Sequence, residues 1–423
     1  MSAPAHPVSL RRGLLTPGVL VLSCIALTGL AAAAYRFVFG LGAATNLTDQ
    51  YPWGLWIGVD VASGVALAAG GFTSAAVAHV FHRRRYEVLV RPALLTAMLG
   101  YTFAVIGLMA DLGRYYNIWH PVWPTMWQGN SVLFEVAMCV TIYLNVLYIE
   151  FLPIVCERFI GRVSLPGPLK ALNGPIDALL RAARGTLAKI MFLFIAAGVV
   201  LSCMHQSSLG SLLLIAPYKM SPLWYTPVLP LMFLLSAFAA GFAMVVFESL
   251  LASWTFGRKP EMPVLSAYSR FVAVFLGVYG MARISDLMIR EAWGGAFAGD
   301  AASFMFLAEI GLGVALPFAM LFFTRVRRSP AGLLTASSLV VFGVLLNRIN
   351  VFLVAFKPPY AQGHYFPGIA EILVTVGLVA GLVLAYRVCV TVFPVLPVEE
   401  CETVEASETV QPRCPVQAES YVS

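Results

Sequence analysis

The sequence predicts an all-α integral membrane protein with about ten transmembrane helices, and two observations lead to that fold class. Of the 423 residues, 60% are hydrophobic and only 11% are charged, whereas a soluble domain has about 25% charged residues. The apolar residues also form continuous runs of about 20 residues or more, the length that an α-helix needs to cross a hydrocarbon core. The runs do not alternate in polarity, so helices are predicted rather than the strands of a closed barrel.

Ten such runs mark the predicted spans. The first follows Arg11 and Arg12 as a signal peptide would, but it has no clear small-residue cleavage site and continues to Phe39, so we expect a retained helix. The spans are predicted at residues 16–39, 54–80, 91–112, 130–156, 187–206, 224–254, 265–288, 301–324, 331–356 and 368–394.

The loops between the spans alternate in charge, and this pattern predicts the topology. Cytoplasmic loops of membrane proteins carry an excess of Lys and Arg. Here every second loop is basic, as in residues 83–91, 158–189, 258–270 and 325–328, and the loops between them hold few cations. We therefore expect an even number of spans with both termini in the cytoplasm. Because topology explains the basic loops, no nucleic-acid partner is expected.

The composition also predicts how the chain is organised. Residues 1–15 form a cytoplasmic N-terminus, residues 16–396 a polytopic membrane domain, and residues 397–423 a disordered acidic cytoplasmic tail. The longest basic loop, residues 157–186, is rich in Pro, Gly and Arg and is expected to carry no domain of its own. The outer loop at residues 113–129 holds two tyrosines and three tryptophans. Part of this is the aromatic belt of an interface, and a docking surface for an external subunit is the open alternative.

Ionisable side chains inside the spans are candidate functional residues, because an ionised group near the bilayer centre costs about 2.5–3.5 kcal/mol on insertion scales. Asp111 and Arg114 have an i, i+3 spacing that allows an ion pair, or they only neutralise a helix end. Glu135 lies in the apolar run SVLFEVAMCV with no cation within four residues, which favours proton handling or ligand binding over packing. His205 is either a ligand or a solvated helix end. The full outer group is Asp60, Asp111, Arg114, Glu135, His205 and Gln206.

A second group of charges occupies the later spans. Its members are Glu248, Arg283, Asp286, Glu309, Arg348 and Glu371. Arg283 and Asp286 repeat the spacing of the earlier pair in reversed order, and Glu309 follows Glu135 by four spans. This pattern predicts a parallel repeat of two four-helix bundles, spans 2–5 (about 54–206) and spans 6–9 (about 224–356), flanked by spans 1 and 10. The group is interpreted either as buried ion pairs or as a proton path through Glu248, Arg283, Asp286, Glu309 and Arg348.

The sequence offers no means of storing electrons. Haem b needs two histidines at matched depth, and His6, His79, His82, His120, His205 and His364 form no convincing pair. The seven cysteines form no CxxC motif or cluster, so no iron–sulfur or other metal site is expected. A carboxylate, a histidine and aromatic residues near the outer face could still hold a quinone headgroup and exchange its protons. Any electrons would then come from a partner.

Several stretches resemble the NrfD/PsrC family of quinone-reactive membrane subunits, and most closely its ten-helix branch, the HybB-type subunit of respiratory [NiFe]-hydrogenases. They are FVFGLG (37–42), YPWGLWIGVD (51–60), LVRPALLTAMLGY (89–101), DLGRYYN (111–117), NSVLFEVAMCVTIY (130–143), MHQSSLGSL (204–212) and AFAGD (296–300).

The resemblance, which extends to about residue 396, implies a function. A subunit of this family binds menaquinone or ubiquinone near the periplasmic face of the bacterial inner membrane, within the first four-helix bundle and without haem. It receives electrons from a ferredoxin-like iron–sulfur subunit docked outside, which is linked to hydrogenase subunits or a multihaem cytochrome. The family's glutamate for quinone-linked proton transfer matches Glu135, and depth and polarity extend the predicted site to the rest of the outer group. The subunit is not expected to be catalytic alone.

Two other classes of function stay open. Internal repeats and midplane charges also mark secondary transporters and ion channels. The main polar group lies near one face, however, and no pair of broken half-helices is apparent. A pure membrane anchor for a periplasmic enzyme is the third possibility, and it leaves Glu135 unexplained.

Overall fold

The all-α membrane fold predicted from the sequence is confirmed. The computed structural model describes residues 6–8, 16–361 and 363–398, and within them ten helical segments are long and apolar enough to span a bilayer. They are Pro17–Phe39, Trp56–Val80, Arg84–Asp111, Val132–Phe159, Leu169–Ser211, Leu229–Thr255, Met262–Ile289, Ala301–Phe322, Pro330–Val354 and Ile369–Val392.

Seven of these segments are built mainly from one regular α-helix each. These are α1 (Pro17–Phe39), α5 (Glu87–Asp111), α6 (Val132–Phe159), α7 (Asn173–Ser211), α8 (Leu229–Thr255), α9 (Met262–Ile289) and α14 (Ile369–Val392). The other three contain wide π-helical turns, a feature often found at functional sites. They are η1 (Trp56–Ser63), α3 (Gly64–Leu67), α4 (Gly70–Ala75) and η2 (Ala76–Val80); α10 (Ala301–Ile310), η10 (Gly311–Ala315) and α11 (Leu316–Phe322); and α13 (Pro330–Ile349) with η11 (Asn350–Val354).

Short elements connect the spans. They are α2 (Leu41–Ala44), α12 (Thr324–Arg328) and the 3₁₀ turns Arg84–Tyr86, Tyr115–Asn117, His120–Val122, Pro124–Met126, Gly167–Leu172, Pro217–Lys219 and Ala292–Phe297.

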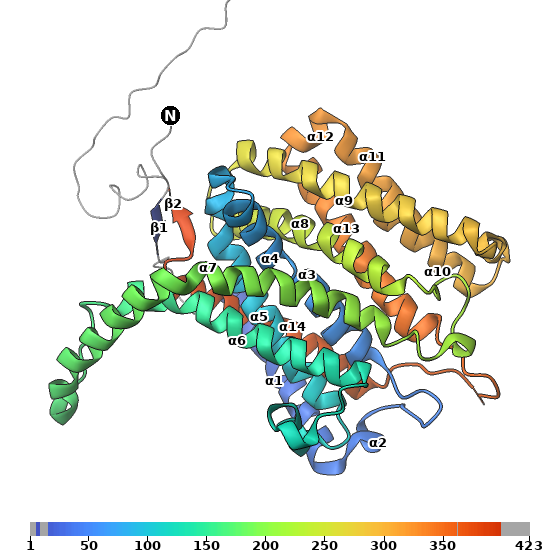
Figure 1. Ribbon diagram of the computed structural model, residues 1–423, viewed down its shortest axis with the longest axis horizontal. Coiled ribbons are helices and arrows are strands. Elements are labelled where there is room, and N and C mark those ends of the chain that lie inside the picture. The colour runs from blue at the N-terminus through green and yellow to red at the C-terminus, as the bar shows by residue number, and fades with distance from the viewer. Residues whose placement is uncertain (1–5, 9–15, 362, 399–423) are drawn as a thin grey trace, which may run out of the picture.

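The two ends of the chain meet at one end of the helical bundle. Strand β1 (His6–Val8) pairs antiparallel with β2 (Leu396–Val398), which contacts α5; the two strands are seen at the left of Figure 1. We call this end the basic face, with loops 81–86, 160–168, 256–261 and 323–329. The opposite end is the aromatic face, with loops 45–55, 112–131, 212–228, 290–300 and 355–368. Both termini therefore lie on one side, as the even number of spans requires, and the cytoplasmic orientation of that side stays a prediction. Most of the tail predicted to be disordered, residues 399–423, lies outside the described residues.

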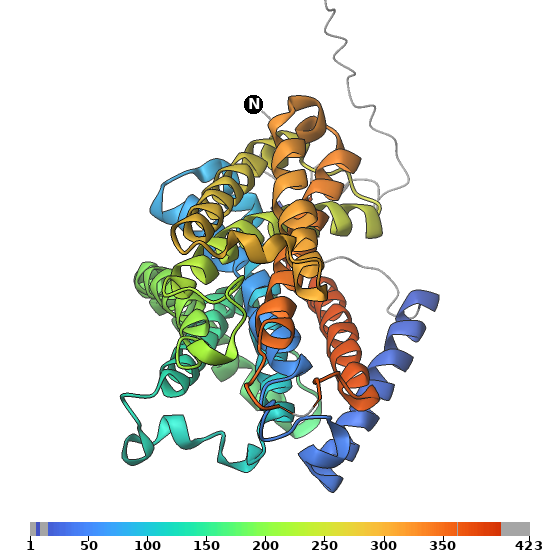
Figure 2. The same cartoon turned by 90° about the vertical axis from the view of Figure 1, so that its right-hand side faces the viewer.

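The helices pack through close contacts between small residues. Helix α1 lies outside the others, beside α14 (Figure 2), and a Cβ added at Gly29 would stand 2.5 Å from the Cα of Gly377. Helix α8 approaches the second span in the same way, since a Cβ on Gly241 would stand 2.8 Å from the backbone of Ala69. Small residues at helix interfaces let backbones approach where no hydrophobic force between helices exists in lipid.

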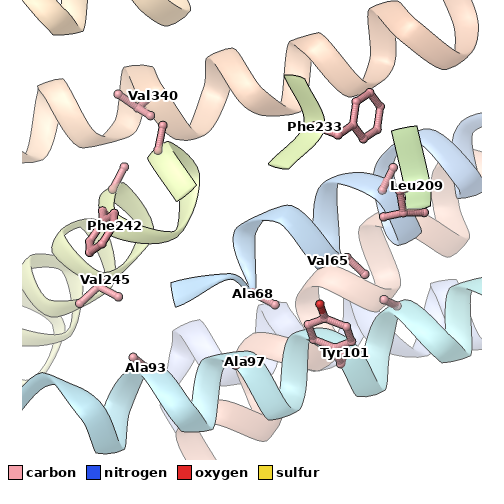
Figure 3. Close-up of a cluster of buried hydrophobic side chains, with 14 of the residues drawn as sticks. Val65, Ala68, Ala93, Ala97, Tyr101, Leu209, Phe233, Phe242, Val245 and Val340 are labelled. Atoms are coloured by element: carbon pink, nitrogen blue, oxygen red, sulfur yellow. The ribbon is translucent and has the colours of Figure 1, made fainter. Parts of the chain in front are cut away.

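A continuous apolar core joins the first and second halves of the chain. Val65 and Ala68 of the second span face Tyr101 of α5, and the same cluster includes Phe242 of α8 (Figure 3). Helix α8 packs against α7 and α4 of the first half and also against α9 and α13 of the second. The division into two four-helix bundles therefore stays a prediction, because α8 contacts both groups.

The basic loop after the fourth span is shorter than predicted. Helix α7 begins at Asn173 and runs for 39 residues, about 58 Å at 1.5 Å per residue. Pro175 falls in its first turn, where a missing N–H does no harm. The Asp177 carboxylate accepts a hydrogen bond from the Gly161 amide at 2.5 Å, which ties this end of α7 to the connection after α6. The fifth span was predicted to begin at residue 187, and the helix begins earlier because its first turns lie before the apolar run.

Candidate functional site

Glu135 lies at the aromatic end of α6, nearer the surface than the sequence indicated. The Ser131 hydroxyl accepts a hydrogen bond from the Phe134 amide at 3.4 Å and so caps the start of α6 at Val132. Glu135 therefore stands in the first turn, where the helix dipole favours a carboxylate. Its side chain is exposed in the isolated chain. The Glu135 carboxylate accepts a hydrogen bond from the Ser208 hydroxyl of α7.

A set of buried polar side chains lies between α5, α6 and α7, deeper than Glu135. We call it the central polar cluster, and its members are Tyr101, Tyr143, Ser202, His205 and Gln206. Tyr101, Ser202, His205 and Gln206 are fully buried, and Tyr143 is 1% exposed. The Tyr101 ring stands edge-on to Tyr143 at 4.7 Å between centroids and 5.7 Å from the His205 ring. Helix α7 continues past this point to Ser211, so the alternative of a solvated His205 at a helix end is wrong.

Most polar atoms of the central polar cluster lack hydrogen-bond partners within the protein. Gln206 donates its amide N–H to the Val65 carbonyl at 2.9 Å. Ser202 lies near both tyrosine hydroxyls and Gln206 lies near that of Tyr101, yet Tyr101 Oη, Ser202 Oγ, His205 Nδ1 and Nε2, and Gln206 Oε1 have no partner in hydrogen-bond geometry. A buried polar group without a partner costs about 1–3 kcal/mol. Five such atoms in one place therefore point to a site that receives a polar ligand or water.

A second polar group at the aromatic face, the carboxylate cluster, joins the first, second, third and last spans. Its carboxylates are Asp60, Asp111 and Glu371, and its cation is Arg36 of α1. Asp60 is 8% exposed and accepts a hydrogen bond from Thr375 at 2.7 Å. Asp60 and Asp111 therefore face α14 and α1, away from α7, so the structure does not gather all six predicted outer residues into one site.

Glu371 is the most tightly held carboxylate of this cluster. It is fully buried and accepts hydrogen bonds from the Gly368 amide at 2.9 Å, the Asn46 amide at 3.0 Å and the Tyr365 hydroxyl. Tyr365 stands just outside the last span, and burial raises the pKa of its phenol far above the usual value, so that it stays a donor. With its oxygens satisfied, Glu371 has the contacts of a structural carboxylate.

The predicted ion pair between Asp111 and Arg114 is not formed. Helix α5 ends at Asp111 and the backbone turns extended at Leu112, so the helical i, i+3 geometry is lost. Arg114 is exposed in the loop and, in the part of the chain that the structure describes, has no ion pair. Arg36 instead reaches across from α1 and donates to the carbonyls of Ala110 and Leu112, each at 2.5 Å. It thereby caps the carboxyl end of α5, where a cation is favourable.

In the later spans, Glu309 and Arg348 form a buried network with each other through Asn347. The Glu309 carboxylate accepts hydrogen bonds from Asn347 at 2.7 Å, Asn350 at 2.8 Å and Trp224 at 2.8 Å. Arg348 donates to Asn347 at 2.5 Å and lies over the ring of Phe233 at 3.7 Å. The two charges are each 1% exposed. Because both Glu309 oxygens are satisfied, the contacts favour a structural network over a proton path. The two charges form no direct ion pair in the described part of the chain, and the neutral Asn347 bridges them.

The other members of the second group are separate from this network or use other partners. Asp286 pairs with Arg290 at 2.6 Å, whereas Arg283 donates to the Leu223 carbonyl at 3.0 Å, so the predicted Arg283–Asp286 pair was wrong. The reason is that Arg283 turns into the core, where it is 1% exposed, while Asp286 stays near the end of α9. Glu248 lies near the basic face, where its carboxylate accepts a hydrogen bond from the Tyr386 hydroxyl at 2.8 Å.

The internal repeat was predicted from two ion pairs of matching spacing and from two glutamates in matching spans. The structure does not support these matches, and the repeat itself stays a prediction. Neither of the two matching ion pairs forms. Glu135 is exposed in the first turn of α6, whereas Glu309 is 1% exposed at the ninth residue of α10, so the two glutamates are not equivalent in depth.

Sequence reasoning missed several residues of these clusters. Tyr101, Tyr143 and Ser202 carry no charge, so a search for intramembrane charges passes over them. Their spacing gives a weak signal, because Ser202 and His205 stand at i, i+3 on one face of α7. Arg36 lies inside the predicted first span but was not among the candidate charges, and only the tertiary contact between α1 and α5 gives it a role.

The fold and site define the class of this protein as a polytopic α-helical membrane protein whose buried polar groups converge near one face. The family described as polysulphide reductase, NrfD, matches residues 43–356. The chain therefore belongs to the NrfD family of membrane subunits of respiratory oxidoreductases.

Individual relatives agree with this assignment. The chain is 38% identical to a protein of Nitratidesulfovibrio vulgaris, over 91% of this chain and 96% of that protein. It is 37% identical to the probable Ni/Fe-hydrogenase 2 b-type cytochrome subunit of Escherichia coli, over 90% and 91% of the two chains. It is 27% identical to the menaquinone reductase integral membrane subunit of N. vulgaris, over 87% and 88%.

Proposed function

We propose that this chain is the quinone-reactive subunit of a respiratory oxidoreductase complex in the bacterial inner membrane. In this proposal the central polar cluster holds the headgroup of menaquinone or ubiquinone, and an iron–sulfur subunit on the aromatic face exchanges electrons with it. Relatives named as a hydrogenase subunit and as a menaquinone reductase subunit support the class of reaction. The observation that carries the proposal is the group of partnerless polar atoms between α5 and α7.

The central polar cluster suits the chemistry of a quinone headgroup. Quinone carbonyls accept hydrogen bonds, and the reduced form carries hydroxyl donors in their place. The Tyr101 hydroxyl can donate or accept, and a neutral His205 ring has one donor and one acceptor nitrogen. Gln206 keeps its amide oxygen free while its N–H anchors it to Val65. The cluster therefore offers hydrogen-bond donors and acceptors suited to either form of a quinone, and the apolar core around it would exclude water.

Protons for this chemistry would travel along α6 and α7. Glu135 stands at the aromatic face, where it can exchange protons with water, and its carboxylate is bonded to the Ser208 hydroxyl. Ser208 follows His205 by three residues, about one helical turn. In our proposal Glu135 relays protons through Ser208 toward His205. Positioned proton transfer of this kind contributes about 10²–10⁴-fold to rate.

The outer loop between α5 and α6 supplies the proposed docking surface. Tyr116, Trp119, Trp123 and Trp127 are 63%, 49%, 58% and 46% exposed in the isolated chain. Several exposed aromatic side chains in one loop are typical of a protein–protein interface, where such residues often dominate the binding energy. The carboxylate cluster and the exposed Arg114 lie at the same face and are not assigned to the quinone.

The test is the rate of quinone reduction by the assembled complex carrying Glu135→Gln. We expect at least a tenfold loss, because the amide cannot relay a proton. Glu291→Gln is the matched control, since Glu291 is an exposed glutamate in another loop of the aromatic face. A wild-type rate in the Glu135 variant would refute the relay. Solute flux by the purified chain in liposomes, without bound quinone, would instead favour a transporter.

A further inference from the structure

Glu150 is a membrane carboxylate that the proposed site does not use. It lies in α6, nine residues before the helix ends at Phe159, about 13 Å along the helix axis. In the described part of the chain, no hydrogen bond or ion pair joins its side chain to another residue. A charge at this depth is costly and is by default a functional candidate.

The contacts of Glu150 are made possible by a glycine in α7. A Cβ added at Gly198 would stand 2.9 Å from Glu150 Oε1 and 3.6 Å from Cε2 of Tyr143. The Glu150 carboxylate and the Tyr143 ring therefore both lie next to the backbone of Gly198, and the two side chains are neighbours. Glycine inside a helix is about 1 kcal/mol less favourable than alanine. Gly198 thus leaves space for the Glu150 carboxylate at the edge of the central polar cluster.

Glu150 also belongs to a row of polar side chains along one side of α6. Glu135, Tyr143, Glu150 and Glu157 follow each other at spacings of eight, seven and seven residues, or about 10–12 Å along the axis. Glu157 is at the basic face, paired with Arg91 at 2.9 Å and about one-third exposed. The row runs from one face of the bundle to the other and passes the Tyr101–Tyr143 ring pair at its centre.

We propose that Glu150 delivers protons from the basic face to the central polar cluster, with Gly198 holding open the place of its carboxylate. This inference rests on the proposed function and adds a second route: of the two protons that reduction of a quinone consumes, Glu135 delivers one from the aromatic face and Glu150 delivers the other from the basic face. A proton enters from water at the basic face beside Glu157, reaches the Glu150 carboxylate along α6, and moves on through the Tyr143 hydroxyl toward Tyr101 and His205. Each transfer breaks one bond to hydrogen and forms another, so no oxidant or reductant is needed. The proton that Glu150 delivers to the cluster is then drawn across the membrane from the basic face.

The test uses the assembled complex in liposomes that contain a pH dye. Electron donor is added outside, so that only complexes with the aromatic face outward turn over. Quinone reduction and alkalinisation of the lumen are followed together. We expect the wild-type complex to take up protons from the lumen, and Glu150→Gln to lower this uptake at least tenfold. Gly198→Ala should do the same by displacing the carboxylate.

Control variants separate proton delivery by Glu150 from a general effect of substitutions within the helices. Gly185→Ala changes a glycine of the same helix that has open space around it, so lumenal uptake should stay at the wild-type level. The inference would be overturned if proton uptake from the lumen were unchanged in both Glu150→Gln and Gly198→Ala. It would also be overturned if this uptake were lost only in Glu248→Gln. Absence of lumenal uptake in the wild-type complex during quinone reduction would overturn it as well, while leaving the proposed function intact. A wild-type complex that reduces no quinone would refute the proposed function itself.

Discussion

Replacement of His205 by leucine separates a ligand-binding role from a structural role. Both ring nitrogens of His205 are buried without partners, and each such group costs about 1–3 kcal/mol in the folded state. Leucine removes both polar atoms at a similar volume. The variant loses the ring contact with Tyr101 at 5.7 Å, a loss of about 0.5–1.5 kcal/mol for an aromatic pair.

The balance of these effects predicts opposite changes in stability and activity. The free energy of unfolding of the quinone-free chain should rise by about 0.5–5 kcal/mol, because the relief of two unpaired groups, about 2–6 kcal/mol, exceeds the lost ring contact. Quinone reduction should fall about tenfold or more, the loss expected when one hydrogen bond of about 1.5 kcal/mol to substrate is removed. Thermal unfolding in detergent and steady-state quinone reduction by the assembled complex measure the two quantities.

The opposite outcome would refute this reasoning. If His205→Leu melted at a clearly lower temperature while its complex reduced quinone at the wild-type rate, the ring would be a structural element. The partnerless atoms would then carry no information about a ligand. Tyr101→Phe is a second variant of the same kind, because it removes only the partnerless hydroxyl and keeps the ring against Tyr143.

Two further predictions concern contacts elsewhere in the chain. Asn347→Leu should lower the free energy of unfolding by about 3–5 kcal/mol, because it breaks the link between the buried charges of Glu309 and Arg348 and leaves each poorly paired; thermal unfolding measures this. Trp123→Ala should weaken binding of the outer subunit by at least tenfold, the effect of losing an interface residue worth more than about 1.4 kcal/mol, while the chain itself melts as the wild type does.

Each of these has a contradicting result. An Asn347→Leu variant as stable as the wild type would mean that Asn347 does not stabilise the buried charges of Glu309 and Arg348 by bridging them. Co-purification of the outer subunit at wild-type yield with Trp123→Ala, and equally with Trp119→Ala, would move the docking surface away from this loop. Val122→Ala serves as the control, because it is exposed in the same loop without an aromatic ring.

Most of the fold followed from hydropathy, since lipid imposes long apolar helices. The ends of the predicted spans differ from the observed ones by at most seven residues, except at the start of the fifth. There the helix runs on past the apolar segment, and a hydropathy pattern does not register a helix that has left the bilayer. The pairing of β1 with β2 was also not predicted, because each is only three residues long.

The site was predicted less completely, because sequence spacing does not report which helices face each other. Asp111 and Arg114 have the spacing of a pair, but the helix ends between them and Arg36 arrives from α1. His205 was found by residue type, whereas Tyr101 could be recognised only once α5 and α7 were placed together. Glu135 was identified as a carboxylate inside a predicted span with no cation within four residues. Glu150 has the same surroundings in the predicted fourth span, so it could have been named from the sequence.

A quinone site in the central polar cluster is tested most directly by photochemical labelling of the assembled complex with a quinone that carries a photoreactive group on its headgroup. Binding in this cluster predicts that the label is recovered on peptides of α5 and α7 around Tyr101 and His205. Excess unmodified quinone should compete for this labelling, and His205→Leu should diminish it. Competed labelling confined to other helices, with none on α5 or α7, would contradict a quinone site between them.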